Sequence, residues 1–158
     1  MKNQKIETML LGELCDPGGR GMGRRYRLPN NEVLIINPRG TAAFIFDVME
    51  PFHLADKFFP FIERLPFKAP ALDDENLLTD TGKTYKKDRH TTVRRIFSRP
   101  NGVETYIDDG LLKLFDKTVA LYQQDGALTI VAVVEKQITG EQKVMGYVMP
   151  CHAPAKTN

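Results

Sequence analysis

The residues of this sequence best suited to chemistry lie in one basic stretch, residues 82–99, which reads GKTYKKDRHTTVRRIFSR. Seven Lys and Arg residues stand against one acid there, which gives the stretch a formal charge of +6. Lys and Arg pair with phosphate, and Arg does so through a planar fork of N–H donors. Tyr85 and Phe97 alternate with the charge, as aromatic residues do where single-stranded bases stack. The stretch therefore predicts contact with nucleic acid.

A second basic segment, residues 18–27, reads GGRGMGRRYR and holds four Arg without an acid, a charge of +4. The whole chain carries only +2, so the residues outside the two segments sum to −8. This asymmetry predicts one basic face if the two segments meet in space. The glycines predict a mobile loop over residues 18–25, whose Arg forks and backbone N–H groups suit phosphate. A solvated hairpin tip is the alternative interpretation of this loop.

The candidate ligand of these two segments is nucleic acid or an acidic protein surface, since both present anionic oxygens to Lys and Arg. Our first hypothesis is a small non-enzymatic protein that binds nucleic acid or a nucleic-acid-bearing complex. The second is an inhibitor or accessory factor of a host or mobile-element machine, which docks on an acidic partner. The predicted binding residues are Arg20, Arg24, Arg25, Lys86, Lys87, Arg89, Arg94 and Arg95.

His90 raises a third hypothesis, a small enzyme that acts on a phosphoester. His90 and Thr92 form a His-x-Thr pair, a motif that some phosphoesterases carry twice. His53 and His152, the other two histidines, do not complete a second motif. General acid–base catalysis at His90 would also need a pocket that holds the phosphate beside it. We therefore rank catalysis below binding and interpret His90 as a surface residue.

The sequence predicts no metal site and no cofactor. The acidic groups at residues 73–75 and 108–109 lack the spacing of a calcium loop and suit helix caps or solvated loops. Cys15 and Cys151 stand near opposite ends of the chain, so they form neither a zinc motif nor a disulfide framework. We interpret them as two reduced thiols.

The apolar segments of the chain are short. Glu7 and Glu13 interrupt the apolar part of the N-terminal segment, which excludes a signal-peptide core there. The longest apolar run, residues 128–134, is far shorter than the roughly 20 residues that cross a bilayer as a helix. We expect a soluble cytoplasmic protein without a membrane partner.

Strand patterns dominate the chain. Residues 26–48 read as three strands joined by PNNE and NPRG turns, with apolar runs typical of strands covered on both faces. Residues 91–108 predict a hairpin around Pro-Asn-Gly, with a basic first strand that suits a sheet edge. Residues 108–117 favour a short helix, and residues 118–150 predict a three-stranded meander.

Residues 50–65 are the best helical candidate, because apolar residues recur there every three to four positions. Pro60 interrupts the pattern and predicts a kink or two short helices. Seven of the nine Phe lie between Phe44 and Phe67. We interpret this cluster as core, with an exposed patch that grips a protein partner as the alternative.

These elements predict an α+β fold over residues 1–158, a single domain. The fold would be a mostly antiparallel sheet of seven or eight strands, with a C-terminal β-meander and one or two short helices. A β-barrel or sandwich is the alternative. Residues 68–90 read as a long connection, and residues 153–158 as a frayed tail.

Overall fold

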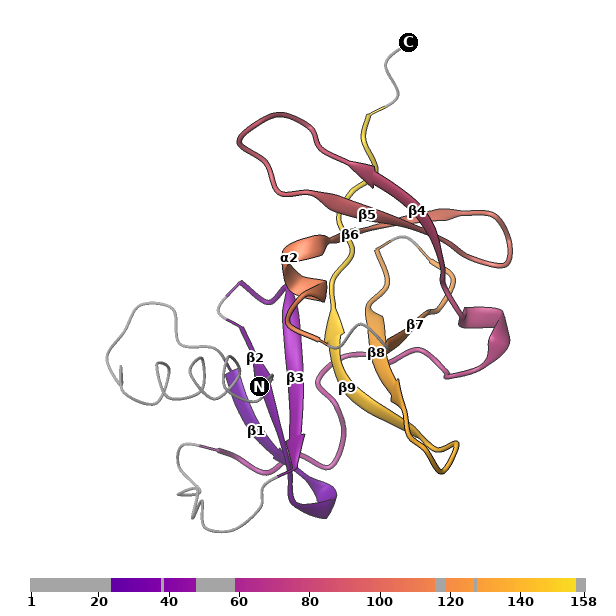
Figure 1. Cartoon of the computed structure of the whole chain (residues 1–158). Helices are drawn as coiled ribbons and strands as arrows, with labels where there is room; N and C mark the ends of the chain where they lie inside the picture. The colour runs from indigo at the N-terminus through magenta and orange to yellow at the C-terminus, as the bar shows by residue number, and fades with distance from the viewer. Residues whose placement is uncertain (1–23, 38, 48–58, 116–118, 127, 156–158) are drawn as a thin grey trace.

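Two antiparallel sheets build the fold (Figure 1). The structure is a computed structural model that describes residues 24–37, 39–47, 59–115, 119–126 and 128–155. The larger sheet has the strand order β1-β2-β3-β9-β8-β7 and the smaller one β4-β5-β6. The strands are β1 (Arg24–Leu28), β2 (Glu32–Ile36), β3 (Ala42–Asp47), β4 (Thr79–Tyr85), β5 (Arg94–Ser98), β6 (Glu104–Asp108), β7 (Val119–Gln123), β8 (Val131–Lys136) and β9 (Gln142–Val148).

The larger sheet consists of two three-stranded meanders, β1-β2-β3 and β7-β8-β9, which β3 and β9 join by antiparallel pairing. The turn between β2 and β3 is held by Asn37, whose side-chain oxygen accepts from Thr41 N at 2.8 Å and from Ala42 N at 3.1 Å. Gly40 supplies the positive φ of 66° that this turn requires. The predicted three strands of residues 26–48 and the predicted C-terminal meander are both confirmed.

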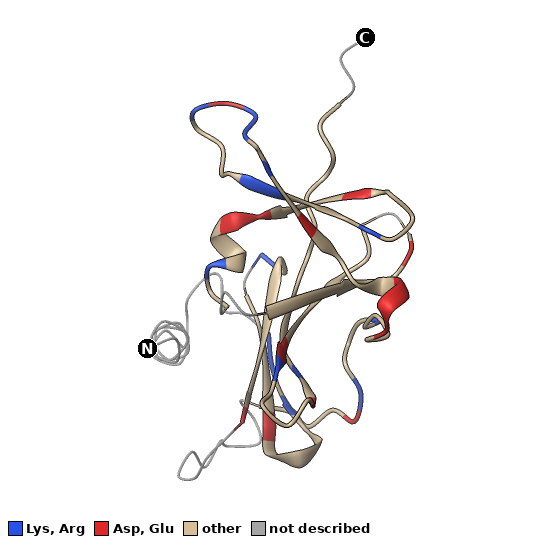
Figure 2. Ribbon diagram, turned by 45° about the vertical axis from the view of Figure 1, so that its right-hand side comes forward, with Lys and Arg blue, Asp and Glu red and all other residues tan. Residues whose placement is uncertain are grey.

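The smaller sheet lies beside one end of the larger sheet, and its strands run across those of the larger one (Figures 1 and 2). The predicted hairpin is confirmed as β5 and β6, and its turn closes with an Arg99 N to Val103 O bond of 3.0 Å. The predicted short helix is confirmed as α2 (Asp109–Leu112). Asp108 caps α2, because its side chain accepts from Gly110 N at 2.7 Å.

The expected long connection over residues 68–90 differs from the structure, because it contains the 3-10 turn η2 (Asp74–Asn76) and the whole of β4. The sequence of β4, TDTGKTY, is polar, and no residue in it is buried, so it lacks the apolar alternation of a half-buried strand. The prediction that the basic strand is a sheet edge is wrong, since β5 lies between β4 and β6.

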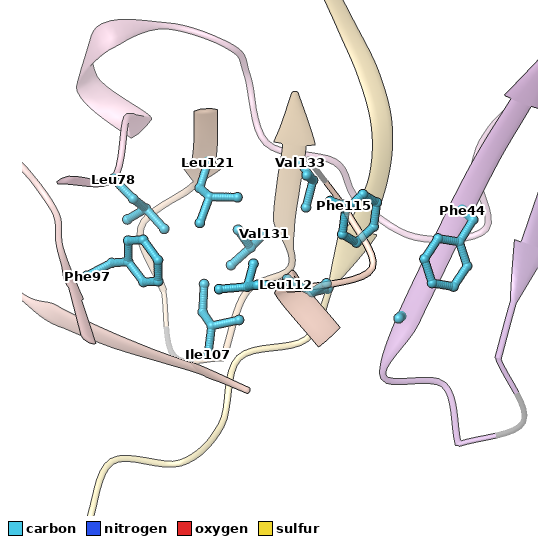
Figure 3. Packing of buried hydrophobic residues seen from close by; sticks show 11 residues of the cluster. Phe44, Leu78, Phe97, Ile107, Leu112, Phe115, Leu121, Val131 and Val133 are labelled. Carbon is cyan, nitrogen blue, oxygen red and sulfur yellow. The ribbon is translucent and has the colours of Figure 1, made fainter. Parts of the chain in front are cut away.

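The main core fills the space between the two sheets (Figure 3). Side chains from one face of the larger sheet meet the inner face of the smaller sheet and α2. Phe115 stacks on Phe44 with 5.3 Å between ring centres, and its ring also covers Gly146. The buried members are Ala42, Phe44, Leu78, Phe97, Ile107, Leu112, Phe115, Leu121, Val131, Val133 and Val148.

A second core covers the opposite face of the larger sheet, and Phe59 covers the remaining face of β2. β2, β3 and β8 are therefore buried on both faces, as their apolar runs predict. Residues 62–77 form much of this cover. Phe44 and Phe59 are buried, and Phe46 and Phe67 are half-buried, which supports the core interpretation of the Phe cluster. Phe61 remains exposed.

The predicted helix over residues 50–65 is wrong for its described part, residues 59–65, where the chain has no helix. This part runs beside β1 instead. Arg27 N donates to Pro60 O at 3.0 Å, and Ile62 N donates to Arg27 O at 3.0 Å. These bonds to β1 replace those that a helix would make, and Pro60 has no N–H to offer a helix. The first part of the prediction lies outside the described residues.

The described residues thus form nine strands in two sheets with a single short α-helix. This arrangement is compatible with the predicted α+β class and with a sandwich. The six-stranded sheet ends at β1 and β7, so it does not close into a barrel. No helix in the described part of the chain has the length and apolar character needed to cross a lipid bilayer.

Candidate nucleic-acid interface

The hairpin of β4 and β5 projects from the body of the molecule and carries exposed cations around its loop (Figure 2). Lys83 lies on β4, and Lys86, Lys87 and Arg89 lie on the loop; all four are exposed. Of the predicted binding residues, Lys86, Lys87, Arg89, Arg94 and Arg95 belong to this hairpin. The structure therefore gathers five of the eight predicted residues on one element.

The loop is held in place by its single acid. The Asp88 carboxylate accepts from His90 N at 2.7 Å and from Thr91 N at 3.0 Å. The Thr91 hydroxyl accepts from Asp88 N at 3.1 Å and donates to Asp88 O at 3.0 Å. Asp88 therefore acts as a turn-forming residue, since an Asp side chain that binds the next backbone N–H groups fixes a turn. Asp88 also places one negative charge among the cations of the loop.

Arg94 and Tyr85 face each other across the β4–β5 pair, where they are register partners. The Arg94 guanidinium carbon lies 6.0 Å from the centre of the Tyr85 ring, a cation–π distance. Tyr106 of β6 meets Tyr85 edge-on, with 6.2 Å between ring centres. Arg94 Nη1 also donates to His152 O at 2.9 Å. One side of the hairpin base thus combines two aromatic rings with a fixed guanidinium.

Arg95 contributes less to this surface than the sequence predicts. It forms an ion pair with Asp80, and its guanidinium lies 5.2 Å from the centre of the Phe97 ring. A backbone hydrogen bond from Gly82 N holds the pKa of Asp80 below its ordinary value, and Arg95 lowers it further. The Arg95 charge is therefore largely balanced within the smaller sheet.

The expectation that Phe97 stacks on bases is wrong, because its side chain belongs to the core between the sheets. Alternation along β5 explains this result. Arg95 and Phe97 lie two residues apart, so both point to the side that faces the larger sheet, and Phe97 lies deepest. The aromatic partner of Tyr85 is Tyr106, which the sequence analysis missed. Tyr106 is the register partner of Ile96 in the β5–β6 pair. The sequence could have indicated this pairing, because counting residues outward on both sides of the Pro-Asn-Gly turn sets Tyr106 opposite Ile96.

Arg99, one of the seven cations counted in the basic stretch, serves the fold. Its side chain is 9 % exposed and pairs with Asp125 at 3.0 Å. Arg99 Nε donates to Gln123 Oε1 at 3.1 Å, and the Thr105 hydroxyl donates to the same oxygen at 2.6 Å. Gln123 in turn donates to Thr129 O at 2.8 Å. This network ties the β5–β6 turn to the β7–β8 turn.

Arg24 and Arg25 lie on β1, at an edge of the larger sheet, whereas the hairpin loop lies at the far end of the smaller sheet (Figure 1). Arg25 is buried, and its guanidinium lies 5.8 Å from the centre of the Phe59 ring. Arg24 is exposed. These two residues therefore do not share a surface with the hairpin, so for them the condition for a single basic face is not met. They begin a strand and not the expected loop; Arg20 and the rest of that loop lie outside the described residues.

His90 is exposed on the hairpin loop, and its imidazole Nε2 accepts from Arg89 Nε at 3.1 Å. An exposed loop histidine lacks the enclosed surroundings that hold a substrate against a general acid or base. This position gives no support to phosphoester chemistry. Among the described residues, no group of three or more His, Cys, Asp or Glu is arranged to hold a metal ion.

Comparison of the chain with protein-family models, with curated protein sequences and with solved structures found no match.

Proposed function

We propose that this protein binds nucleic acid through the projecting β4–β5 hairpin. The observation that carries the proposal is the gathering of exposed cations on that one element. The exposed cations are Lys83, Lys86, Lys87 and Arg89, and the half-buried Arg94 lies at the base of the hairpin. The single loop acid, Asp88, is engaged with backbone N–H groups.

The hairpin would bind by electrostatic attraction to phosphates. Each phosphate neutralised by Lys or Arg releases condensed counterions, and this release drives association without regard to sequence. Lys86 and Lys87 carry their ammonium groups at the ends of long flexible side chains, which suits contact with a phosphate backbone of variable shape. Arg94 is held by His152 O, so its remaining N–H donors have a fixed direction.

The pair of Tyr85 and Tyr106 favours single-stranded over double-stranded ligands. Both rings are half-buried beside the cations. Bases of a single strand can stack on such rings, whereas those of a duplex are already stacked on each other. We therefore propose that the ligand is a single strand, or the single-stranded part of a larger complex, read by charge and stacking without base-specific contacts.

The test compares two double variants with the same change in charge. Lys86→Glu/Lys87→Glu alters the hairpin loop, and Arg64→Glu/Lys68→Glu alters two exposed residues of the segment that covers the opposite face of the larger sheet. Binding to fluorescein-labelled single- and double-stranded DNA and RNA is measured by anisotropy at fixed salt. We expect the hairpin variant to bind at least about tenfold more weakly than the other variant. Equal losses would mean that only net charge matters and would contradict the proposal.

The same experiment separates nucleic acid from an acidic protein partner. The two ligands share anionic oxygens but differ in charge spacing and in the presence of bases. If the wild-type chain binds none of the four nucleic acids at low salt, the proposal fails. An acidic protein surface would then be the better explanation of the cationic hairpin.

A further inference from the structure

A pocket of about 560 Å³ lies at the end of the larger sheet, away from the cationic hairpin loop. The turn η1 (Pro29–Asn31), the β8–β9 turn and residues 63–65 surround it. Its volume lies within the range of small-molecule sites in proteins, roughly 300–1,000 Å³. Leu28, Ile45, Leu65 and Val144 give it an apolar floor. An apolar floor beneath a few polar groups is the usual composition of such sites.

Tyr147 supplies a polar group to this pocket. Its side chain is 4 % exposed, lines the pocket, and packs edge-on against Phe67 with 4.9 Å between ring centres. Its hydroxyl makes no hydrogen bond to another described residue, and its oxygen is not fully buried, so it is accessible to water or to a ligand. Burial, with a smaller effect of Glu32, raises the pKa of Tyr147 to about 12, so the hydroxyl stays protonated and neutral at physiological pH. A polar group of a ligand would satisfy it.

The charge around the pocket is negative. Three carboxylates, of Glu32, Glu63 and Glu141, line it against one cation, Lys143. Lys143 is engaged in an ion pair with Asp47. Burial and the neighbouring Asp47 raise the pKa of Glu32 above its ordinary value, while Lys143 opposes them. An incoming positive charge would offset this unfavourable environment of the Glu32 carboxylate.

We propose that this pocket binds a small organic cation that carries an apolar body. The ammonium or amidinium group would donate to the Glu32 carboxylate and to the Tyr147 hydroxyl oxygen. The apolar body would lie on the floor formed by Leu28, Ile45 and Val144. This site is separate from the hairpin, so it stands or falls independently of nucleic-acid binding.

The test uses three probes of similar size: phenethylammonium as the cation, 2-phenylethanol as the neutral analogue and phenylacetate as the anion. Binding to the full chain is followed by protein NMR shifts and by titration calorimetry. We expect phenethylammonium to bind with a Kd of about 1 mM or tighter and the other two probes to bind at least about tenfold more weakly. Equal binding of the three probes would mean an apolar hollow without charge selection and would overturn the proposal. Absence of phenethylammonium binding would overturn it as well.

Substitutions in the pocket test whether phenethylammonium binds there. Glu32→Gln and Tyr147→Phe each remove one polar partner while keeping the side-chain shape, and each is expected to weaken phenethylammonium at least about fivefold. Glu75→Gln in η2 and Tyr26→Phe in β1 are the matched controls outside the pocket, and neither should change binding. Circular dichroism checks that every variant is folded. If the controls lose as much affinity as the pocket variants, the probe binds elsewhere and the proposal is wrong.

Discussion

The guanidinium of Arg94 lies 6.0 Å from the centre of the Tyr85 ring and also donates a hydrogen bond of 2.9 Å to the carbonyl oxygen of His152. The hydrogen bond from Arg94 to His152 joins the base of the cationic hairpin to the segment after β9. Next to it, Cys151 N donates to Tyr106 O at 2.7 Å. The aromatic rings and the fixed cation on the hairpin are thus held by contacts from a distant part of the chain.

Tyr85 is the residue whose change should best reveal stacking. Tyr85→Ala is expected to weaken binding of a single-stranded oligonucleotide by about tenfold, because base stacking on an aromatic side chain contributes roughly 1–3 kcal/mol. Tyr85→Phe keeps the ring and should bind like the wild type. Fluorescence anisotropy with a labelled single strand measures both. Loss of affinity in Tyr85→Phe equal to that in Tyr85→Ala would show that the hydroxyl, and not the ring, matters.

Asp88 should separate the shape of the loop from its charge. Asp88→Asn keeps an oxygen that accepts from His90 N and Thr91 N, but it removes the negative charge among the cations. We expect tighter nucleic-acid binding, by about two- to fivefold, from the removal of that charge near the phosphates. Asp88→Ala removes the charge and the turn contacts together and should gain less. Weaker binding by Asp88→Asn than by the wild type would contradict the electrostatic mechanism.

Arg99 is expected to affect stability and not binding. Arg99→Met removes the donor that faces Gln123 and leaves polar groups of Gln123 and Thr105 with fewer partners. The free energy of unfolding should fall by about 2 kcal/mol, the usual loss when a buried hydrogen-bonded network is broken. Urea denaturation measures this change. Nucleic-acid affinity under folding conditions should stay within about twofold of the wild type, and a loss as large as that of the hairpin variant would place Arg99 in the interface.

The raised pKa of Glu32 predicts that the stability of the protein depends on pH. Its pKa in the folded state is raised above 4.5, first by burial and then by Asp47, so the folded state holds the proton more tightly than the unfolded state. The resulting contribution to stability falls as pH rises through 4.5 and the folded pKa, and it is absent at higher pH. Glu32→Gln removes this dependence. The Tm of the variant should match the wild type at pH 4 and exceed it at pH 7.

Thermal unfolding by circular dichroism at a series of pH values provides the measurement. Glu75→Gln, at an exposed residue of η2, is the control and should show no such divergence. A wild-type protein that gains stability relative to Glu32→Gln as pH rises would reverse the sign and contradict this assignment.

The buried strands and their turns could be predicted from the sequence because their signals are local. β2, β3 and β8 are apolar on successive residues, which matches burial on both faces. The hairpin of β5 and β6 follows from a Pro-Asn-Gly turn between β-rich runs. The same holds for the cations of the hairpin loop, which lie close in space because they lie close in sequence.

The remaining features depend on partners far away in the chain. β4 is a strand because its backbone pairs with β5, although its polar side chains show no strand pattern. The apolar residues near Phe61 have helical spacing, but the chain forms no helix there because the backbone groups of Pro60 and Ile62 bond to β1. Arg99 looks like one more surface cation until Gln123, 24 residues later, is seen to accept from it. Such long-range pairs leave no trace in local periodicity.

The dependence of affinity on salt tests the central claim most directly. The dissociation constant for a labelled single strand is measured across a range of salt concentrations for the wild type and for Lys86→Glu/Lys87→Glu. If about four phosphates contact the hairpin, the wild-type plot of log affinity against log salt should have a slope of about −3, and the variant slope should be shallower by about 1.5. A wild-type affinity that does not change with salt, or identical slopes for the two proteins, would contradict nucleic-acid binding by this hairpin.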